Sequence, residues 1–371
     1  MSGHESAQRA MPKGELDRLL QEMRAQGYRT YGPRVRNDVL VYDEIESLRD
    51  LPQGYGSRQE PGSYRLVGED HDRYFDITPA ADTWKRFLFP PVSSLFSVRR
   101  DDGTWEIEST VETAEKRAFI GVRPCELAAI EIQDRIFSRS PLHDPIYQAR
   151  RQNCLLVVVN CLHPGDTCFC ASVGTGPKAD TGFDLSLTEL VDVFLVEAGT
   201  PKGAELLKAV TTQVPAQRQL HAAEAALDWA DGHMGRKLDT DGLPELMLEH
   251  LDSPYWQGVG ARCLGCASCT QVCPTCFCWD VQDGSAIDGS GANRTRIWDS
   301  CFNPSHSYHA AGLTHPTITS RYRQWLTHKL GSWVEQFGGL GCVGCGRCIT
   351  WCPAGIDLTA ETEALRQECA S

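Results

Sequence analysis

Apolar positions in the first two thirds of the chain predict helices interleaved with short strands. Residues 12–26 (PKGELDRLLQEMRAQ) place four apolar side chains on one helical face, namely Leu16, Leu19, Leu20 and Met23. Runs that suit strands follow in NDVLVYDEI, SYRLVGE, RAFIGV and CLLVVVN. The segment PCELAAIEIQDRIF has a helical pattern, with Pro124 in its first turn. Strands that alternate with helices over residues 1–245 predict an α/β or α+β domain.

The pattern changes near residues 252–260, where the turn-rich SPYWQGVG marks a boundary. Beyond it, residues 320–339 (SRYRQWLTHKLGSWVEQFGG) carry apolar side chains at i, i+3, i+4 and i+7 spacing. This spacing predicts a helix with one wide apolar face, ended by Gly338 and Gly339 as a C-cap. Core packing is the usual role of such a face, and exclusion of water from a neighbouring metal centre is a second interpretation.

The composition narrows the class of protein. Of the 371 residues 41% are apolar, but no run approaches the about 18 apolar residues of a membrane span, so we expect no membrane insertion. The formal net charge of -13 argues against a nucleic-acid partner, because such a partner needs a basic face. The N-terminal MSGHESAQRAMPKGE lacks the apolar region of an export signal, which favours a cytoplasmic protein.

Seventeen cysteines carry most of the chemical information. Their number is odd and their spacing is tight, so metal ligation by reduced thiols is favoured over disulfides. Residues 263–274 read CLGCASCTQVCP and residues 342–353 read CVGCGRCITWCP. The spacing C-x2-C-x2-C-x3-C-P therefore occurs twice.

This spacing is typical of bacterial two-cluster ferredoxins, in which the fourth cysteine of each run ligates the other cluster. Three cysteines on one tight loop reach three irons of a [4Fe–4S] cubane, so the fourth ligand must come from elsewhere. The predicted first set is Cys263, Cys266, Cys269 and Cys352. The predicted second set is Cys342, Cys345, Cys348 and Cys273. A four-cysteine zinc site is the alternative, but its usual pattern pairs two C-x2-4-C knuckles.

These motifs complete the expected domain organisation. We expect an α/β-type (α/β or α+β) domain at residues 1–252, followed by a two-[4Fe–4S] ferredoxin-like domain at residues 253–371. The segment between the two cysteine runs is then an insertion, and we expect it to be helical at residues 303–338. The small residues Gly265, Gly344 and Gly346 beside the ligands let backbone N–H groups approach cluster sulfurs.

Four further cysteines predict a third [4Fe–4S] site. Each lies just past a strand or in the turn that follows, where ligands converge at the edge of a sheet. This third set is Cys125, Cys161, Cys168 and Cys170. The alternative is that they are scattered reduced thiols, which are common without function. A weaker group of thiols could supply a ligand in their place, namely Cys276, Cys278 and Cys301.

The chain lacks the motifs of a catalytic site, so we predict no catalytic residue. Residues 174–177 (GTGP) begin like a dinucleotide-binding loop, but Ala179 stands where its third glycine is needed. Neither GxxxxGK[ST] nor GxSxG occurs. With metal centres and no flavin or nicotinamide motif, the sequence predicts a subunit that passes electrons between partners.

Several segments together resemble a known family. They are RPCELAAI, NCLHPGDTCFCASVGTGP, CPTCFCWD, WDSCF, SRYRQWLTHK and GCVGCGRCITWCPAGIDLT. They resemble the iron–sulfur beta subunit of soluble cytoplasmic nickel–iron hydrogenases of the sulfhydrogenase type. The same family includes the corresponding iron–sulfur subunit of anaerobic sulfite reductases. The resemblance extends over residues 85–360.

The resemblance implies a complex. In it, large and small hydrogenase subunits handle hydrogen, a flavin-bearing diaphorase subunit exchanges hydride with NAD(P), and this chain links the two. Two other functions stay open on the sequence alone. One is an electron-transfer subunit of an anaerobic siroheme sulfite reductase, and the other is a zinc-binding structural or interaction subunit.

Overall fold

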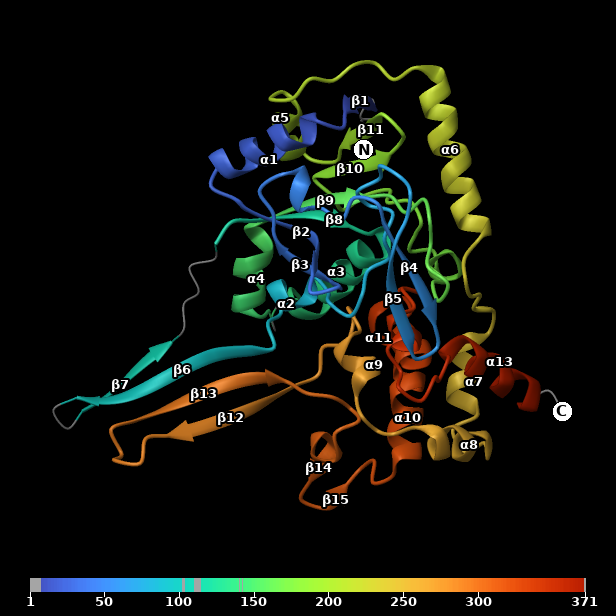
Figure 1. Cartoon of the computed structure of the whole chain (residues 1–371). Helices are drawn as coiled ribbons and strands as arrows, with labels where there is room; N and C mark the ends of the chain where they lie inside the picture. Colours follow the sequence, from blue (N-terminus) through green and yellow to red (C-terminus); the bar gives the residue numbers. More distant parts are fainter. Residues whose placement is uncertain (1–7, 102–103, 110–114, 140, 142, 370–371) are drawn as a thin grey trace.

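A seven-stranded sheet is the largest element of the computed structural model, which describes residues 8–101, 104–109, 115–139, 141 and 143–369 (Figure 1). Its strands lie in the order β1 (Arg9–Pro12), β11 (Val193–Ala198), β10 (Leu185–Glu189), β9 (Cys154–Val159), β8 (Arg117–Val122), β2 (Arg29–Arg36) and β3 (Val39–Glu44). The four strands from β10 to β2 pair in parallel, and the outer strands pair antiparallel. Parallel pairing requires crossover connections, which supply the helices.

Helices cover both faces of this sheet, so the fold is mixed α/β, as the alternating pattern predicts. Successive residues of β9 point to opposite faces. Leu155 and Val157 pack with helices α1 (Glu15–Ala25) and α5 (Pro201–Leu207). Leu156 and Val158 pack on the other side with α2 (Lys85–Leu88), α3 (Pro124–Phe137) and α4 (Pro145–Gln152). The predicted apolar face of α1 is confirmed, since all four of its residues are buried.

A second core lies among the helices after the sheet. They are α7 (Leu243–Glu249), α8 (Tyr255–Arg262), α9 (Ser268–Gln271), α10 (Ile318–Thr327), α12 (Arg347–Thr350) and α13 (Leu358–Cys369). Helix α6 (Gln217–Gly232) packs against β11 instead, and α11 (Trp333–Phe337) packs against α3. Trp256, Trp325 and Leu365 meet in this core, together with Met247 of α7. Residues 238–247 therefore pack against the C-terminal part of the chain, although the predicted boundary lies after them.

The predicted apolar face of residues 320–339 is largely buried, and Gly338 ends its helix with φ of +76°. The helix is not continuous. A π-helical segment, His328–Ser332, separates α10 from α11. Such segments contain an extra residue per turn and are frequent at functional sites, and the regular spacing of apolar residues does not predict them.

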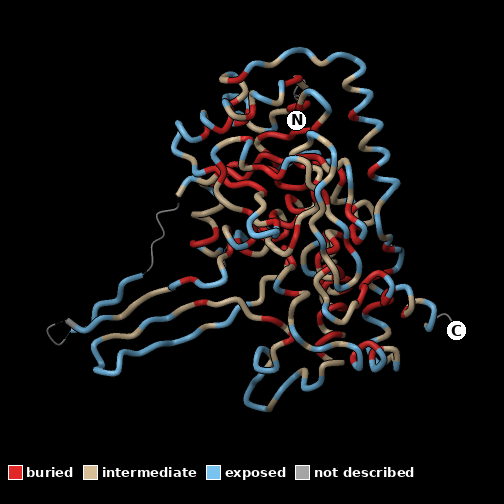
Figure 2. The backbone as a smooth tube through the Cα atoms, in the orientation of Figure 1, coloured by how far each residue is buried: buried red, intermediate tan, exposed pale blue. Residues whose placement is uncertain are grey.

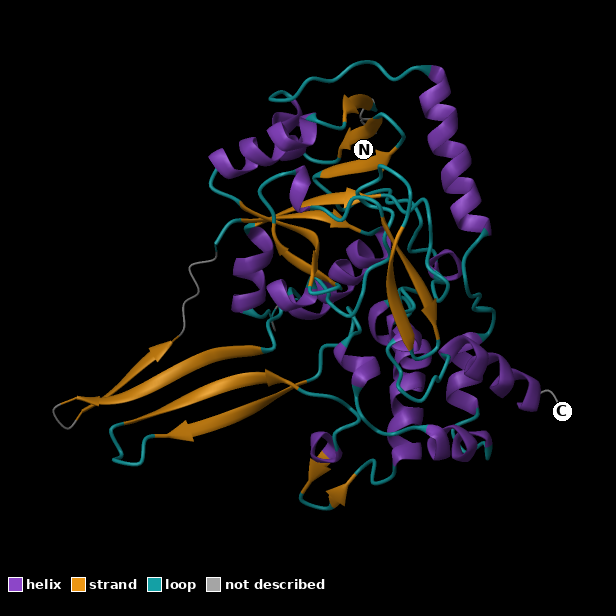
Figure 3. Ribbon diagram, viewed as in Figure 1, coloured by secondary structure: helices purple, strands orange, loops and turns teal. Residues whose placement is uncertain are grey.

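An arm of four antiparallel strands extends from the body in Figure 3, and Figure 2 shows that most of it is exposed. Its order is β12 (Trp279–Ser285), β13 (Gly291–Trp298), β6 (Val92–Asp101) and β7 (Thr104–Ser109). The arm joins distant parts of the sequence, because β13 of the cysteine-rich region pairs with β6 of the first part. It was not predicted, since strands exposed on both faces lack a regular apolar alternation.

Smaller elements complete the described structure. Two hairpins are β4 (Tyr55–Glu60) with β5 (Ser63–Gly68) and β14 (Tyr308–His309) with β15 (Gly312–Leu313), and short 3-10 turns lie at Leu48–Asp50, Cys170–Val173 and Pro304–Ser307. The tip of the β4–β5 hairpin reaches the C-terminal part, where the Gly62 N–H donates to the Ile349 carbonyl at 3.1 Å. In the part of the chain that the structure describes, no helix combines the length and the apolar character that crossing a bilayer requires.

Candidate metal centres

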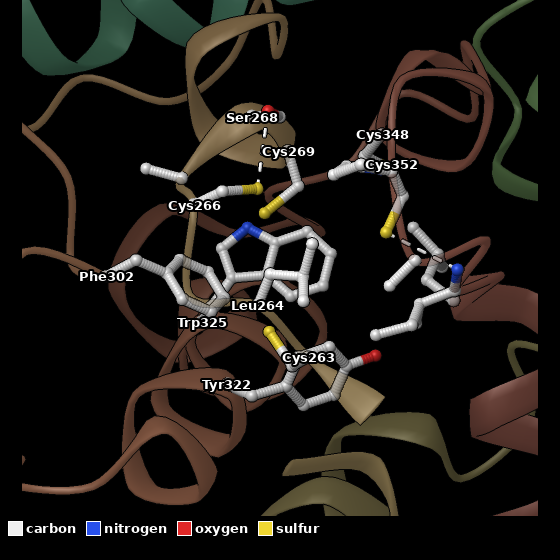
Figure 4. Close-up of a pocket in the computed structure, with 15 residues that line it drawn as sticks. Cys263, Leu264, Cys266, Ser268, Cys269, Phe302, Tyr322, Trp325, Cys348 and Cys352 are labelled. Carbon is white, nitrogen blue, oxygen red and sulfur yellow. Dashed lines mark hydrogen bonds between the residues drawn. The ribbon is translucent and has the colours of Figure 1, made fainter. Parts of the chain in front are cut away.

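The four cysteines of the first set line one cavity in the C-terminal part (Figure 4). Cys263, Cys266 and Cys269 come from the first loop, and Cys352 comes from the second. The structure thus brings the fourth cysteine of the second run to the first run. Apolar side chains make up much of the remaining wall: Leu264, Phe302, Tyr322, Trp325, Ile356 and Leu358.

Left-handed backbone positions shape the first loop. Gly265 has φ of +63° and Ala267 has φ of +65°, and α9 begins directly afterwards. This conformation turns the Gly265 N–H toward the Cys263 sulfur at 3.4 Å. The Ile356 N–H reaches the Cys352 sulfur at the same distance. Backbone N–H groups at ligand sulfurs are an ordinary means of tuning iron–sulfur centres.

The second set gathers in the same way around Cys273. Cys342, Cys345 and Cys348 lie on the second loop, and each interacts electrostatically with Cys273 of the first run. Burial, reinforced by neighbouring thiols, raises the pKa of Cys348, and burial raises that of Cys342 to about 12. Because metal ligation requires thiolates, binding of a cluster here has to displace the thiol protons.

A buried lysine contacts the second set, and no sequence pattern predicts it. The Lys329 ammonium donates to the Cys273 sulfur at 3.4 Å, to the Thr275 hydroxyl at 3.0 Å and to the Gly341 carbonyl at 2.8 Å. Burial lowers the pKa of Lys329, but the surrounding cysteines outweigh burial and hold that pKa well above its usual value. Lys329 lies in the π-helical segment, and a single lysine in a helical pattern carries no signal in the sequence.

The third set also lines one cavity. Cys125 lies in the first turn of α3 after β8, Cys161 follows β9, and Cys168 and Cys170 lie in the next loop. The carboxyl ends of parallel strands β8 and β9 bring these segments together, as expected for ligands at a sheet edge. Burial raises the pKa of Cys168 to about 12. The four thiols therefore lie around one cavity.

The second loop lies directly on the third set. The Phe169 N–H donates to the Gly344 carbonyl at 2.8 Å. A Cβ atom on Gly344 would lie 2.6 Å from Cys170 Cα, and Gly344 has φ of +62°, so only glycine fits there. Cys345 of the second set lines the cavity of the third set as well. The two sets are therefore neighbours.

Two buried arginines stand at this junction. Arg123 and Arg347 both line the third cavity, and Arg347 is held by Glu126 at 2.5 Å. Glu126 also accepts from the Tyr42 hydroxyl at 2.8 Å and from the Trp84 indole at 3.2 Å. These bonds fix the position of the Glu126 side chain, which in turn holds the guanidinium in place. No sequence pattern marks this network, because its members lie far apart in the chain.

The weaker group of thiols lies elsewhere. Cys276 contacts Cys273, while Cys278 contacts Cys301 and His306, and none of the three cysteines lines the third cavity. A hydrogen bond from Cys301 lowers the pKa of Cys278, burial opposes it, and His306 lowers it further. Substitution of these thiols into the third set therefore has no support in the structure.

Comparison with known proteins identifies the family of the chain. Residues 262–356 match the family described as "4Fe-4S dicluster domain". The chain is 31% identical to "Sulfhydrogenase 2 subunit beta" of Pyrococcus furiosus over 343 residues. The aligned region covers 91% of this chain and 92% of the relative. No solved structure matches the chain significantly. The resemblance inferred from the motifs is confirmed, and the chain belongs to the sulfhydrogenase beta-subunit family, with a 4Fe–4S dicluster domain in its C-terminal part.

Proposed function

We propose that this chain is a cytoplasmic electron-transfer subunit that links a nickel–iron hydrogenase module to a flavin and NAD(P) module. Its partners in this proposal are the hydrogenase small and large subunits and a flavin-bearing diaphorase subunit. The name of the relative supports a hydrogenase complex over a sulfite reductase complex. Residues 253–371 would form the ferredoxin-like unit, with residues 303–338 as its helical insertion and residues 1–252 as the other domain.

The donor chemistry of the three sets fits iron–sulfur clusters. Each set offers four thiols, the number that a [4Fe–4S] cubane takes. The first set would hold one cluster, the second set another and the third set a third. Once bound, such clusters supply one-electron exchange at potentials that the surrounding charges, hydrogen bonds and solvent exposure determine.

The observation that carries the proposal is the continuity of the three sets. Cys348 of the second set also lines the cavity of the first set. Cys345 of the second set also lines the cavity of the third set. The second set therefore stands between the other two, and the three form a row. Transfer of electrons across a subunit requires closely spaced centres, and here neighbouring sets have a cysteine in common at their cavities.

One end of the row reaches the surface. Cys266 is exposed, whereas Cys168 and Cys170 at the other end are buried. A redox partner can approach the first set at Cys266 without a conformational change. The chain's own residues hold the sulfurs in place, exclude water with the aromatic wall of the first cavity, and place Lys329 and Arg347 beside the second set.

The test is the coupling of two half-reactions in the assembled complex. The complex with this chain should reduce NAD(P) with hydrogen, and the complex without it should lose that activity while the hydrogenase module still reduces an artificial dye with hydrogen. The Cys125→Ala/Cys168→Ala variant should behave like the complex without the chain. Undiminished reduction of NAD(P) by the complex that lacks this chain would contradict the proposed function.

A further inference from the structure

The cavities of the first and third sets differ in the charge of the side chains that line them. Among the described residues, the wall of the first cavity in Figure 4 has no charged side chain. The wall of the third cavity has two, Arg123 and Arg347, and no carboxylate among its described residues. Both arginines are buried, with exposures of 6% and 2%. Because arginine stays protonated in proteins, two positive charges stand at the third set.

The charge of Arg123 has no carboxylate opposite it among the described residues. Its guanidinium donates to main-chain carbonyls instead, namely those of Ile77 at 2.9 Å, Asn160 at 3.4 Å, Val159 at 3.5 Å and Phe75. These carbonyls satisfy the N–H groups, but they are neutral and leave the charge in place. A buried charge of this kind costs free energy unless an anion neutralises it.

The second arginine, Arg347, is only partly paired. Its Nη2 forms an ion pair with Glu126 at 2.5 Å, and its Nε donates to the Ala80 carbonyl at 2.9 Å. The third nitrogen, Nη1, is buried and has no hydrogen-bond partner in the part of the chain that the structure describes. This nitrogen therefore has donors left for an acceptor. Since Glu126 pairs with one guanidinium only, positive charge is in excess beside the third cavity.

We propose that Arg123 and Arg347 raise the reduction potential of a cluster on the third set above that of a cluster on the first set. The inference rests on the proposed function, in which both sets hold clusters. An electron that a partner delivers near the exposed Cys266 is then held at the inner end of the row, and the transfer breaks no bond. Positive charge beside an iron–sulfur centre favours its reduced form, because reduction adds one negative charge.

Burial of the third set acts in the opposite direction. A medium of low dielectric disfavours added negative charge, so burial alone would place the third set at a lower potential than the first. The same exclusion of water strengthens the attraction between that negative charge and the two guanidinium groups, since solvent screens them little. The uncharged wall of the first cavity offers no such compensation. We therefore expect the arginines to decide the order.

The experiment is a redox titration of the full chain, purified anaerobically and followed by paramagnetic resonance. The signals are assigned by difference with Cys352→Ala, in which the first cluster should be missing, and Cys125→Ala/Cys168→Ala, in which the third should be missing. At the potential where the first cluster of the parent is half reduced, the ratio of reduced to oxidised third cluster should be at least ten. For one electron, this ratio corresponds to about 59 mV.

Variants of Arg123 test the cause of the difference. Arg123→Gln removes the charge and keeps a polar side chain, and it should lower that ratio at least tenfold. Arg123→Lys keeps the charge and should restore most of the loss. The matched control is Arg294→Gln on the arm, where Arg294 is 44% exposed and pairs with Asp283 at 2.7 Å. A charge exposed to solvent is screened, so this control should shift neither potential.

Three results would overturn the inference. The first is a parent chain in which the third cluster is reduced at the same potential as the first or at a lower one. The second is an Arg123→Gln variant with the potentials of the parent. The third is a parent chain without the signal of a third cluster. If the variants fail to fold, the order of potentials in the parent decides. Reduction of NAD(P) by the complex tests the proposed function separately, so the two failures are distinguishable.

Discussion

At the scale of single residues, Cys352 decides whether the two cysteine runs exchange ligands. The structure places Cys352 in the cavity of the first set with Cys263, Cys266 and Cys269. Cys352→Ala should therefore remove the first cluster and lower the iron content by about four atoms per chain, the content of one cubane. The second cluster, on Cys342, Cys345 and Cys348, should keep its iron. Paramagnetic resonance of the reduced variant shows which of the two clusters is lost. Loss of the second cluster's signal would refute the exchange of ligands.

Lys329 is the second residue with a specific consequence, given that the second set holds a cluster. Its buried ammonium contacts the Cys273 sulfur and stabilises the added negative charge of a reduced cluster. Lys329→Gln, which keeps an N–H donor without the charge, should lower the reduction potential of the second cluster and leave the first unchanged. The measurement is a redox titration followed by paramagnetic resonance.

A surface charge provides the matched control. Lys208 pairs with Glu205 on the surface and is 72% exposed, so Lys208→Gln should shift neither potential. Equal potentials in the parent and in Lys329→Gln would show that this lysine has only a packing role.

At the scale of elements, much of the fold follows from local pattern. The spacing in residues 12–26 predicts α1, which buries one face. The apolar pattern of PCELAAIEIQDRIF predicts α3, whose buried residues pack into two clusters. The continuous apolar run CLLVVV predicts β9, since a central parallel strand is buried on both faces. The arm and the π-helical segment escape prediction, because an exposed sheet and an inserted residue leave no periodic signal.

Local sequence patterns also predict some of the candidate sites and not others. Spacing alone predicts which cysteines form the first and second sets, since three ligands are fixed within one loop. The third set follows only from the ends of β8 and β9, which requires the sheet order. The positions of Lys329 and of the Arg347–Glu126 pair depend on contacts between residues far apart in the chain. Local sequence patterns do not reveal such contacts.

The apolar helix α10 yields a prediction at this scale. Trp325 is 5% exposed and lines the first cavity, so Trp325→Ala should cost about 3–5 kcal/mol in the free energy of unfolding. It should also admit water and speed the loss of the first cluster in air. Trp229 on α6 is 47% exposed, and Trp229→Ala should cost less than about 1 kcal/mol. Denaturant titration measures the free energy of unfolding of both variants. An equal loss in the two would contradict the buried packing of Trp325.

At the scale of the whole molecule, the chain is a row of thiol sets held between a sheet edge and a helical core. The described residues place the three thiol sets where the two parts of the chain meet, so formation of the sets depends on the packing of both parts. The arm and Cys266 are both exposed in this organisation.

This organisation predicts that the isolated chain does not turn over. It should neither oxidise hydrogen nor reduce NAD(P), because the sequence shows no motif for a flavin, a nicotinamide or a nickel–iron centre. Its clusters should nevertheless accept electrons from dithionite. Assays of the anaerobic chain with hydrogen and with NAD(P)H test this, and turnover at rates near those of a hydrogenase complex would refute the assignment as a carrier.

The most direct test of the central claim, a row of three [4Fe–4S] sites, is the iron content of the parent chain and of Cys125→Ala/Cys168→Ala. We expect about twelve iron atoms per anaerobically purified parent chain and about eight in the variant, with the signals of the first and second clusters retained. The same iron content and the same resonance spectrum in both proteins would show that the third set binds no cluster and would contradict the account.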